Sequence, residues 1–127
     1  MRGRHLLNLP RILYVEDNFL LALPVEIALE EAGYEVITVT SAEDALLHLE
    51  GNDRLPDLLL TDIRLPGGPD GWAIAQRARE LLPLLPVIYA SGDSAEQWGA
   101  RGVPGSYMLR KPFSLDAAIE MVRRFLS

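Results

Sequence analysis

Cysteine is missing from the 127-residue sequence. Its absence excludes disulfide bonds, thiolate catalysis and zinc sites built on thiolates. Long apolar runs are missing too, since none approaches the roughly 18 residues of a membrane-spanning helix. Basic residues are in the minority, with 12 Lys and Arg against 18 Asp and Glu. The resulting net charge of −6 disfavours direct binding to nucleic acid or to an anionic membrane surface.

The sequence contains enough apolar material for one folded domain. Hydrophobic residues make up 49% of the chain, which excludes a wholly disordered protein. The first ten residues, MRGRHLLNLP, are basic and then apolar, but they end at a proline and are too short for a signal peptide. We therefore expect residues 1–10 to be an N-terminal extension and residues 11–127 to form a single domain.

Sequence patterns predict five strands and five helices in alternation. Apolar and β-branched runs predict strands at 11–15, 34–40, 58–60, 86–91 and 106–112. Apolar residues at helical spacing predict helices at 18–32, 41–51, 72–82, 95–102 and 114–126. Apolar strands joined by helical crossovers indicate the α/β class, with a doubly wound parallel sheet covered by helices on both faces.

Polar side chains lie at the carboxyl ends of four of the five predicted strands. Glu16 and Asp17 lie at the end of the first strand, Asp62 of the third, Ser91 of the fourth and Lys111 of the fifth. In doubly wound sheets ligands bind at the carboxyl ends of the strands. Three carboxylates at one edge repel one another unless a cation joins them. An all-oxygen set of ligands with room for water suits Mg²⁺.

This arrangement also suits phosphoryl chemistry. One carboxylate beside a metal ion and an ammonium group can attack a phosphoryl group, while the cations hold the phosphoryl oxygens. Each residue alone has a simpler interpretation. Asp62 could be a turn residue, Glu16 and Asp17 could cap the first helix, and Ser91 could be a turn serine.

The motifs ILYVEDN, DLLLTDIRLPGGPDGW, VIYASGD and LRKPF, in this order at consecutive strand ends, resemble a response-regulator receiver domain. The resemblance covers about residues 11 to 127. It implies a flavodoxin-like three-layer sandwich with strand order 2-1-3-4-5 and five helices.

The same resemblance implies roles for the polar residues. Asp62 would be the phosphoacceptor, and Glu16, Asp17 and Asp62 would bind Mg²⁺ together with the backbone carbonyl of Arg64. Lys111 would pair with the phosphoryl group.

The resemblance also implies a switch. Ser91 would donate its hydroxyl to the phosphoryl group, moving inward, and the peptide bond before Pro112 would be cis. The family's switch aromatic lies three residues before the lysine, where this chain has Met108. Either Met108 carries the motion, or a bulge restores the neighbouring Tyr107, which otherwise points to the opposite face of the strand.

Two charged residues stand at matching offsets beyond the site residues. Arg64 lies two residues after Asp62, and Asp93 lies two residues after Ser91. We expect them to face each other across the mouth of the site and to screen attacking water. The alternative is that they are two solvated loop charges.

By the resemblance, the partners are a histidine kinase or histidine phosphotransfer protein and an unidentified downstream protein. The phosphodonor would dock along the first helix, which begins with the apolar residues Phe19, Leu20, Leu21 and Leu23. A phosphorylation-dependent homodimer is a further possibility that the sequence leaves open. We expect no direct nucleic-acid or membrane partner and a cytoplasmic location.

The resulting prediction is a phosphoacceptor switch of a two-component system or phosphorelay that acts through protein contacts. No separate output enzyme is expected, only phosphorylation of Asp62 and its slow hydrolysis. One alternative is a pseudo-receiver that binds partners without phosphorylation, and another is the receiver fragment of a hybrid kinase. A small phosphatase is disfavoured because such enzymes need a second acid two residues after the nucleophile, where Arg64 stands.

Overall fold

The computed structural model describes residues 8–51 and 54–126. Its five strands form one parallel sheet in the order β2-β1-β3-β4-β5, as predicted. The strands are β1 (Arg11–Val15), β2 (Glu35–Val39), β3 (Leu58–Asp62), β4 (Val87–Ser91) and β5 (Tyr107–Arg110). Most of the expected extension, residues 1–7, lies outside the described residues.

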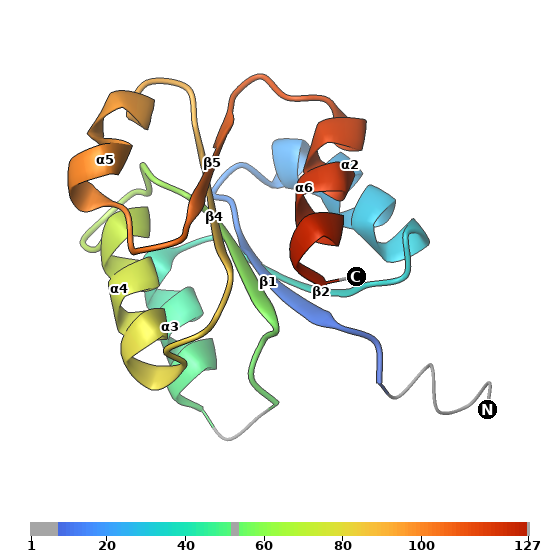
Figure 1. Ribbon diagram of the computed structural model, residues 1–127, viewed down its shortest axis with the longest axis horizontal. Coiled ribbons are helices and arrows are strands. Elements are labelled where there is room, and N and C mark those ends of the chain that lie inside the picture. Colours follow the sequence, from blue (N-terminus) through green and yellow to red (C-terminus); the bar gives the residue numbers. More distant parts are fainter. Residues whose placement is uncertain (1–7, 52–53, 127) are drawn as a thin grey trace.

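Helices cover both faces of the sheet. They are α2 (Phe19–Glu31), α3 (Ala42–Glu50), α4 (Gly71–Leu81), α5 (Trp98–Arg101) and α6 (Leu115–Leu126), and the 3-10 turn η1 (Ala95–Gln97) precedes α5. Figure 1 shows α3, α4 and α5 on one side of the sheet and α2 and α6 on the other. Within residues 8–51 and 54–126, no helix has the length and apolar character needed to cross a bilayer.

Alternation along the strands divides the core into two halves. Leu13 and Val15 of β1 face the half that contains Trp72 of α4, whereas Ile12 and Tyr14 face the half formed with α2 and α6. All five residues of β3 are buried, as expected for a strand covered on both faces. Asp62, the last residue of the third strand, is therefore buried at the carboxyl edge of the sheet.

Local capping determines where the helices begin, close to the carboxyl ends of the strands. Side-chain oxygens of Asn18, Ser41, Asp70 and Ser114 accept hydrogen bonds from backbone N–H groups in the first turns of α2, α3, α4 and α6. Asn18, and not Glu16 or Asp17, is the N-cap of α2, although Glu16 Oε2 accepts a hydrogen bond from the Asn18 N–H at 3.0 Å.

Two further expectations differ from the structure. The fifth strand ends at Arg110 and not at Pro112, although the Lys111 N–H still donates to the Ser91 carbonyl at 2.9 Å. Pro112 follows a cis peptide bond, as predicted, and has no N–H with which to extend the ladder. Helical spacing also predicts an apolar face of Leu115, Ile119, Val122 and Leu126 on the last helix; Val122 is buried as predicted, whereas Leu115 is 41% exposed.

Candidate functional site

The carboxyl edge of the sheet brings the predicted site residues together. These residues line a cavity of about 420 Å³: Glu16, Asp17, Asp62, Arg64, Ser91, Asp93 and Lys111. Asn18 and Leu21 at the start of α2, and Ala90 and Gly92 at the end of β4, complete its lining. These residues come from four separate parts of the sequence. The parallel sheet places their strand ends side by side.

Three carboxylates form the acidic part of the site. Oxygen atoms of Glu16, Asp17 and Asp62 all lie within 4.8 Å of one another. Glu16 and Asp62 are buried, being 2% and 4% exposed, whereas Asp17 is exposed to solvent. An exposed carboxylate next to two buried ones gives a hard divalent cation both charge and an open side for water.

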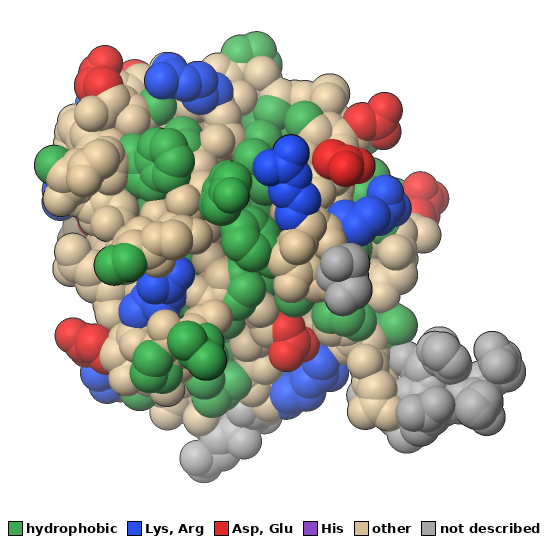
Figure 2. Space-filling view, viewed as in Figure 1, with side chains coloured by type: hydrophobic (Ala, Val, Ile, Leu, Met, Phe, Trp, Pro, Cys, Tyr) green, Lys and Arg blue, Asp and Glu red, His purple; other side chains and the backbone are tan. Residues whose placement is uncertain are grey.

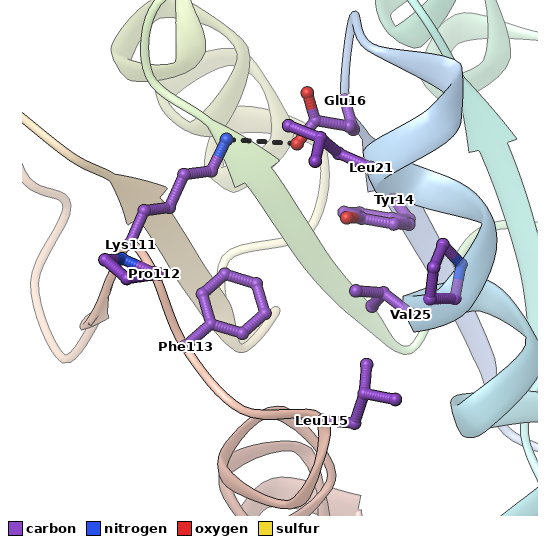
Figure 3. Close-up of a pocket in the computed structure, with 9 residues that line it drawn as sticks. Tyr14, Glu16, Leu21, Val25, Lys111, Pro112, Phe113 and Leu115 are labelled. Atoms are coloured by element: carbon purple, nitrogen blue, oxygen red, sulfur yellow. Dashed lines mark hydrogen bonds and ion pairs between the residues drawn. The ribbon is translucent and has the colours of Figure 1, made fainter.

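Lys111 is the single lysine of the sequence and lies against these acids. Its Nζ is 2.8 Å from Asp62 Oδ1 and donates a hydrogen bond to Glu16 Oε1 at 3.0 Å. Figure 3 shows Lys111 reaching Glu16 from the far side of the site. The ammonium group thus contacts both buried carboxylates at once.

Asp62 is the most strongly perturbed of the acids. Burial, together with the adjacent Glu16, raises the pKa of Asp62 to about 8, although Lys111 opposes the shift. Its buried Oδ1 lies next to the Lys111 ammonium but accepts no well-aligned hydrogen bond within the described residues. A carboxylate oxygen left in this condition would be stabilised by an additional cation.

The neighbours of Asp62 are shifted toward their charged forms. Burial opposes ionisation of Glu16, but its interactions with Asp62, with the Asn18 N–H and with Lys111 outweigh burial and lower its pKa. Burial likewise opposes the charge on Lys111, yet Asp62 and Glu16 outweigh it and raise the Lys111 pKa. Glu16 and Lys111 therefore form a charged pair beside an Asp62 that readily takes up a proton.

Ser91 is directed toward the turn that follows β4. Its Oγ accepts hydrogen bonds from the N–H groups of Asp93 at 3.2 Å and Ser94 at 2.8 Å. The residue is 5% exposed and lines the same cavity as Asp62. Its hydroxyl is therefore at the site but is engaged by the turn.

Arg64 and Asp93 form the ion pair expected from their offsets. Arg64 Nε lies 2.8 Å from Asp93 Oδ2, and both side chains are mainly exposed. The pair joins the loop after β3 to the turn after β4, and both residues line the cavity. The two charges therefore face each other as expected, while their screening of attacking water stays a prediction.

The pairing of β4 with β5 tests the bulge suggested for Tyr107, and the role of Met108 in switching stays a prediction. Residues of β4 and β5 pair without interruption from Ile88–Tyr107 to Ser91–Arg110, so the suggested bulge is absent from this strand pair and that alternative is wrong. Met108 packs against the core half containing Trp72. Tyr107 lies on the other face, where its ring meets Phe125 edge to face at 5.1 Å. Neither residue lines the cavity.

Gly71 is a site residue that the sequence reasoning missed. A Cβ atom at this position would collide with the carbonyl oxygen of Asp62 and lie 2.8 Å from Ile63 Cα. The Gly71 N–H also donates to the Ile63 carbonyl at 2.8 Å. The first turn of α4 therefore presses directly on the backbone that carries Asp62. The available signal was a glycine directly after the Asp70 cap.

An apolar groove adjoins the acidic site. It has a volume of about 430 Å³ and is lined by α2, by the Pro112–Leu115 segment and by Tyr14, with Glu16 and Lys111 at the border with the acidic site (Figure 3). The apolar residues at the start of α2, Phe19, Leu20, Leu21 and Leu23, are 38% to 77% exposed. The core positions of α2 are instead Ala22, Val25 and Leu29.

Comparison with solved structures finds the same fold at high similarity. A response regulator receiver protein from Sinorhizobium medicae is 38% identical with a TM-score of 0.90, and the match covers 94% of this chain and 96% of that one. The receiver domain of the hybrid histidine kinase CckA is 32% identical with a TM-score of 0.77, over 92% of this chain and 99% of that one.

Sequence comparison agrees. The phosphate regulon transcriptional regulatory protein PhoB of Rhizobium meliloti is 32% identical over 123 residues, which are 93% of this chain and 52% of that protein. This chain thus spans about half the length of that curated relative. The family model for the response regulator receiver domain matches residues 12–123. The chain belongs to the response regulator receiver domain family, the phosphorylation-associated signalling module of two-component systems.

Proposed function

We propose that residues 11–127 act as a phosphoacceptor switch that takes a phosphoryl group from phosphohistidine onto Asp62. The observation that supports this most directly is the position of Asp62. It is a buried carboxylate at the end of β3, it lies 2.8 Å from the one lysine of the chain, and two further acids are within 4.8 Å. Such a group is costly to bury without a function that uses it.

In the proposed transfer, an oxygen of ionised Asp62 forms a bond to phosphorus. The bond from phosphorus to the imidazole nitrogen of the donor breaks, and its electron pair returns to the imidazole. Lys111 lies where it can pair with the phosphoryl oxygens. Hydrolysis reverses the state when water attacks phosphorus and the Asp62 carboxylate leaves, which produces inorganic phosphate.

The residues present fit Mg²⁺. Glu16, Asp17 and Asp62 would hold the ion with the backbone carbonyl of Arg64, and the buried Asp62 Oδ1 is an oxygen in need of a cation. Bound Mg²⁺ would neutralise the three carboxylates and the charge of the incoming phosphoryl group. Its binding also requires that Asp62 lose the proton that burial favours.

A histidine kinase or histidine phosphotransfer protein is the proposed phosphodonor, docking on α2 and the adjoining groove. Leu20 is 77% and Phe19 is 58% exposed, and only Asn18 separates Phe19 from the acidic Glu16–Asp17 pair. An exposed apolar ridge beside a polar site is typical of a protein interface. One solved neighbour is a receiver domain from a hybrid histidine kinase, so a place within such a kinase remains the alternative.

For output, we propose protein contacts on the face formed by α5, β5 and α6. Figure 2 shows hydrophobic side chains gathered down the middle of one face of the molecule. Exposed large hydrophobic residues on these elements are Trp98, Tyr107 and Leu115. A downstream protein or a second copy of the phosphorylated chain would fit such a surface.

The Arg64–Asp93 pair is proposed to screen Asp62 from attacking water. It spans the two loops at the mouth of the cavity, and its removal should open a path to the phosphoryl group. Arg64→Ala should therefore change the lifetime of phospho-Asp62. An unchanged lifetime would reduce the pair to a surface contact.

The testing experiment is Trp fluorescence during titration with Mg²⁺ and then with beryllofluoride, compared with Asp62→Asn. Trp72 of α4 is buried against Tyr89 of β4, and Trp98 lies in α5, so the two probes report from the helices before and after β4. A Mg²⁺-dependent response to beryllofluoride that Asp62→Asn abolishes supports the proposal. No response in either protein, with no labelling by acetyl phosphate in mass spectrometry, would favour the pseudo-receiver alternative.

A further inference from the structure

Ser94 is a buried polar residue next to the site that the phosphoacceptor chemistry does not use. It is 3% exposed and lies in the turn between β4 and η1. Its N–H donates to Ser91 Oγ at 2.8 Å, and its own Oγ donates to Asp93 Oδ1 at 3.1 Å. Ser94 thus contacts both the residue expected to switch and one member of the ion pair at the mouth.

Asp93 is held from two sides. Its Oδ1 accepts from the Ser94 hydroxyl, and its Oδ2 lies 2.8 Å from Arg64 Nε. An exposed ion pair alone has little power to fix two mobile side chains. A carboxylate that is also bound to a buried hydroxyl has far fewer orientations available, so Ser94 holds Asp93 where Arg64 can reach it.

Ser91 faces two competing demands. A hydroxyl oxygen can accept two hydrogen bonds, and the N–H groups of Asp93 and Ser94 fill both positions. Rotating the Ser91 side chain so that its Oγ leaves the turn and approaches a phosphoryl group on Asp62 withdraws that acceptor from the buried Ser94 N–H, whereas reorienting the hydroxyl proton alone would not. A buried donor without an acceptor is unfavourable, so the turn must rearrange when Ser91 moves.

We propose that Ser94 is a positioning residue that couples the orientation of the Ser91 hydroxyl to the Arg64–Asp93 ion pair. When Ser91 turns toward Asp62, Ser94 loses its acceptor, the turn shifts, and Asp93 is released from Ser94. The screen over the cavity then loosens, so that engagement of Ser91 and access of water are linked. This inference rests on the proposed function of Asp62 for its consequence, but the contacts can be tested without it.

The first test uses the unphosphorylated protein. The Nε–H resonance of Arg64 is followed by NMR, assigned through Arg64→Lys, with Asp93→Asn as the reference for a broken pair. Ser94→Ala should move the resonance toward that reference, and Ser94→Thr, which keeps the hydroxyl, should restore it. Ser41→Ala is the matched control, since it removes a capping hydroxyl from α3 that has no contact with Asp93. An Arg64 resonance unchanged by Ser94→Ala would overturn the proposal.

The second test is a double-mutant cycle on the lifetime of phospho-Asp62. Ser91 engages the phosphoryl group for only part of the time, and for the rest of the time the ion pair held by Ser94 screens Asp62. Ser94→Ala and Arg64→Ala should therefore each shorten the lifetime by about threefold or more, and the double variant should be no shorter than either. Effects that multiply would mean that Ser94 does not act through the ion pair, which overturns the proposal. If wild-type Asp62 takes up no phosphoryl group while the Arg64 resonance responds as expected, the proposed function fails and the link between Ser94 and Arg64 stands.

Discussion

Lys111 Nζ lies 2.8 Å from Asp62 Oδ1, although their strands are not neighbours in the sheet. β4 separates β3 from β5, so the lysine reaches across the end of a whole strand to make this contact. The site therefore depends on the correct pairing of three strands. It also means that the charge on each residue depends on the other, which makes their titrations the first quantities to test.

The raised pKa of Asp62 predicts that stability falls as pH rises. Folding moves the Asp62 pKa from its ordinary value up to about 8, so the folded state holds a proton that the unfolded state has lost. Stability therefore decreases between about pH 4 and pH 8 and levels off above that range. Asp62→Asn should remove this cost and be more stable than wild type at about pH 8, by at least about 1.4 kcal/mol, the equivalent of one pKa unit.

Urea unfolding in metal-free buffer at several pH values measures this difference. Glu31→Gln, at the exposed end of α2, is the control for loss of one negative charge. Mg²⁺ should stabilise wild type but not Asp62→Asn. If wild type and Asp62→Asn show the same pH dependence, Asp62 is not the group that titrates.

Lys111 should titrate above its ordinary pKa because of its two acidic partners. Burial alone lowers the pKa of this ammonium group, but Asp62 and Glu16 together raise it. Replacing both acids, in Asp62→Asn with Glu16→Gln, should therefore move the Lys111 pKa below the value of a free lysine. Without the two acids, burial is the one effect that still acts on the Lys111 pKa, and burial lowers it.

The single lysine makes this titration direct. Reductive methylation with ¹³C labels Lys111 and the N-terminal amine. The two can be told apart because α-amino groups ordinarily titrate at about pH 8, well below lysine. The two resonances are followed by NMR from neutral to alkaline pH. A Lys111 pKa that is equal in wild type and in the double variant would show that the acids do not hold the ammonium group.

The sequence predicted which distant residues come together at the site better than it predicted how buried each residue is. Parallel strands of known order place residues such as Glu16 and Lys111 at one edge whatever the details of packing. Burial is different, because it depends on which neighbour covers a residue. Leu20 is apolar and at helical spacing, yet it is 77% exposed, and Leu115 is 41% exposed.

Close backbone approach is equally hidden from residue patterns. A glycine after a helix cap, such as Gly71, has no single explanation in the sequence. Only the three-dimensional arrangement shows that the Asp62 carbonyl oxygen occupies the place of a Cβ atom at Gly71. The offset of Arg64 and Asp93 was informative because Asp62 pairs with Ala90, so β3 and β4 end within one residue of each other at the same edge of the sheet. Their loops then start from equivalent positions.

Gly71→Ala should disturb the site through the backbone of Asp62. The added methyl group would collide with the Asp62 carbonyl oxygen, so the first turn of α4 or the end of β3 must shift. We expect a loss of stability of about 1–3 kcal/mol and weaker binding of Mg²⁺. Gly68→Ala is the matched control, since a Cβ there has no atom within 4 Å and the glycine is not in the positive-φ region.

Thermal unfolding and Mg²⁺ titration of the two alanine variants separate these effects. A Gly71→Ala protein as stable as Gly68→Ala would show that α4 can move away from β3 at no cost. Loss of stability with unchanged Mg²⁺ affinity would instead limit the role of Gly71 to packing.

Leu20→Glu should separate docking of the phosphodonor from the chemistry at Asp62. The side chain is 77% exposed on α2, so a charge there should leave folding and labelling by acetyl phosphate nearly unchanged. Transfer from a phosphorylated histidine kinase or phosphotransfer protein should fall by about tenfold or more, because the charge would have to be buried in the interface. Leu84→Glu is the control, since Leu84 is 94% exposed in the loop before β4, at the opposite end of the strands. If both variants slow transfer from the protein donor equally, the donor does not dock on α2. If Leu20→Glu also slows labelling by acetyl phosphate, α2 shapes the phosphoacceptor site itself rather than an interface beside it.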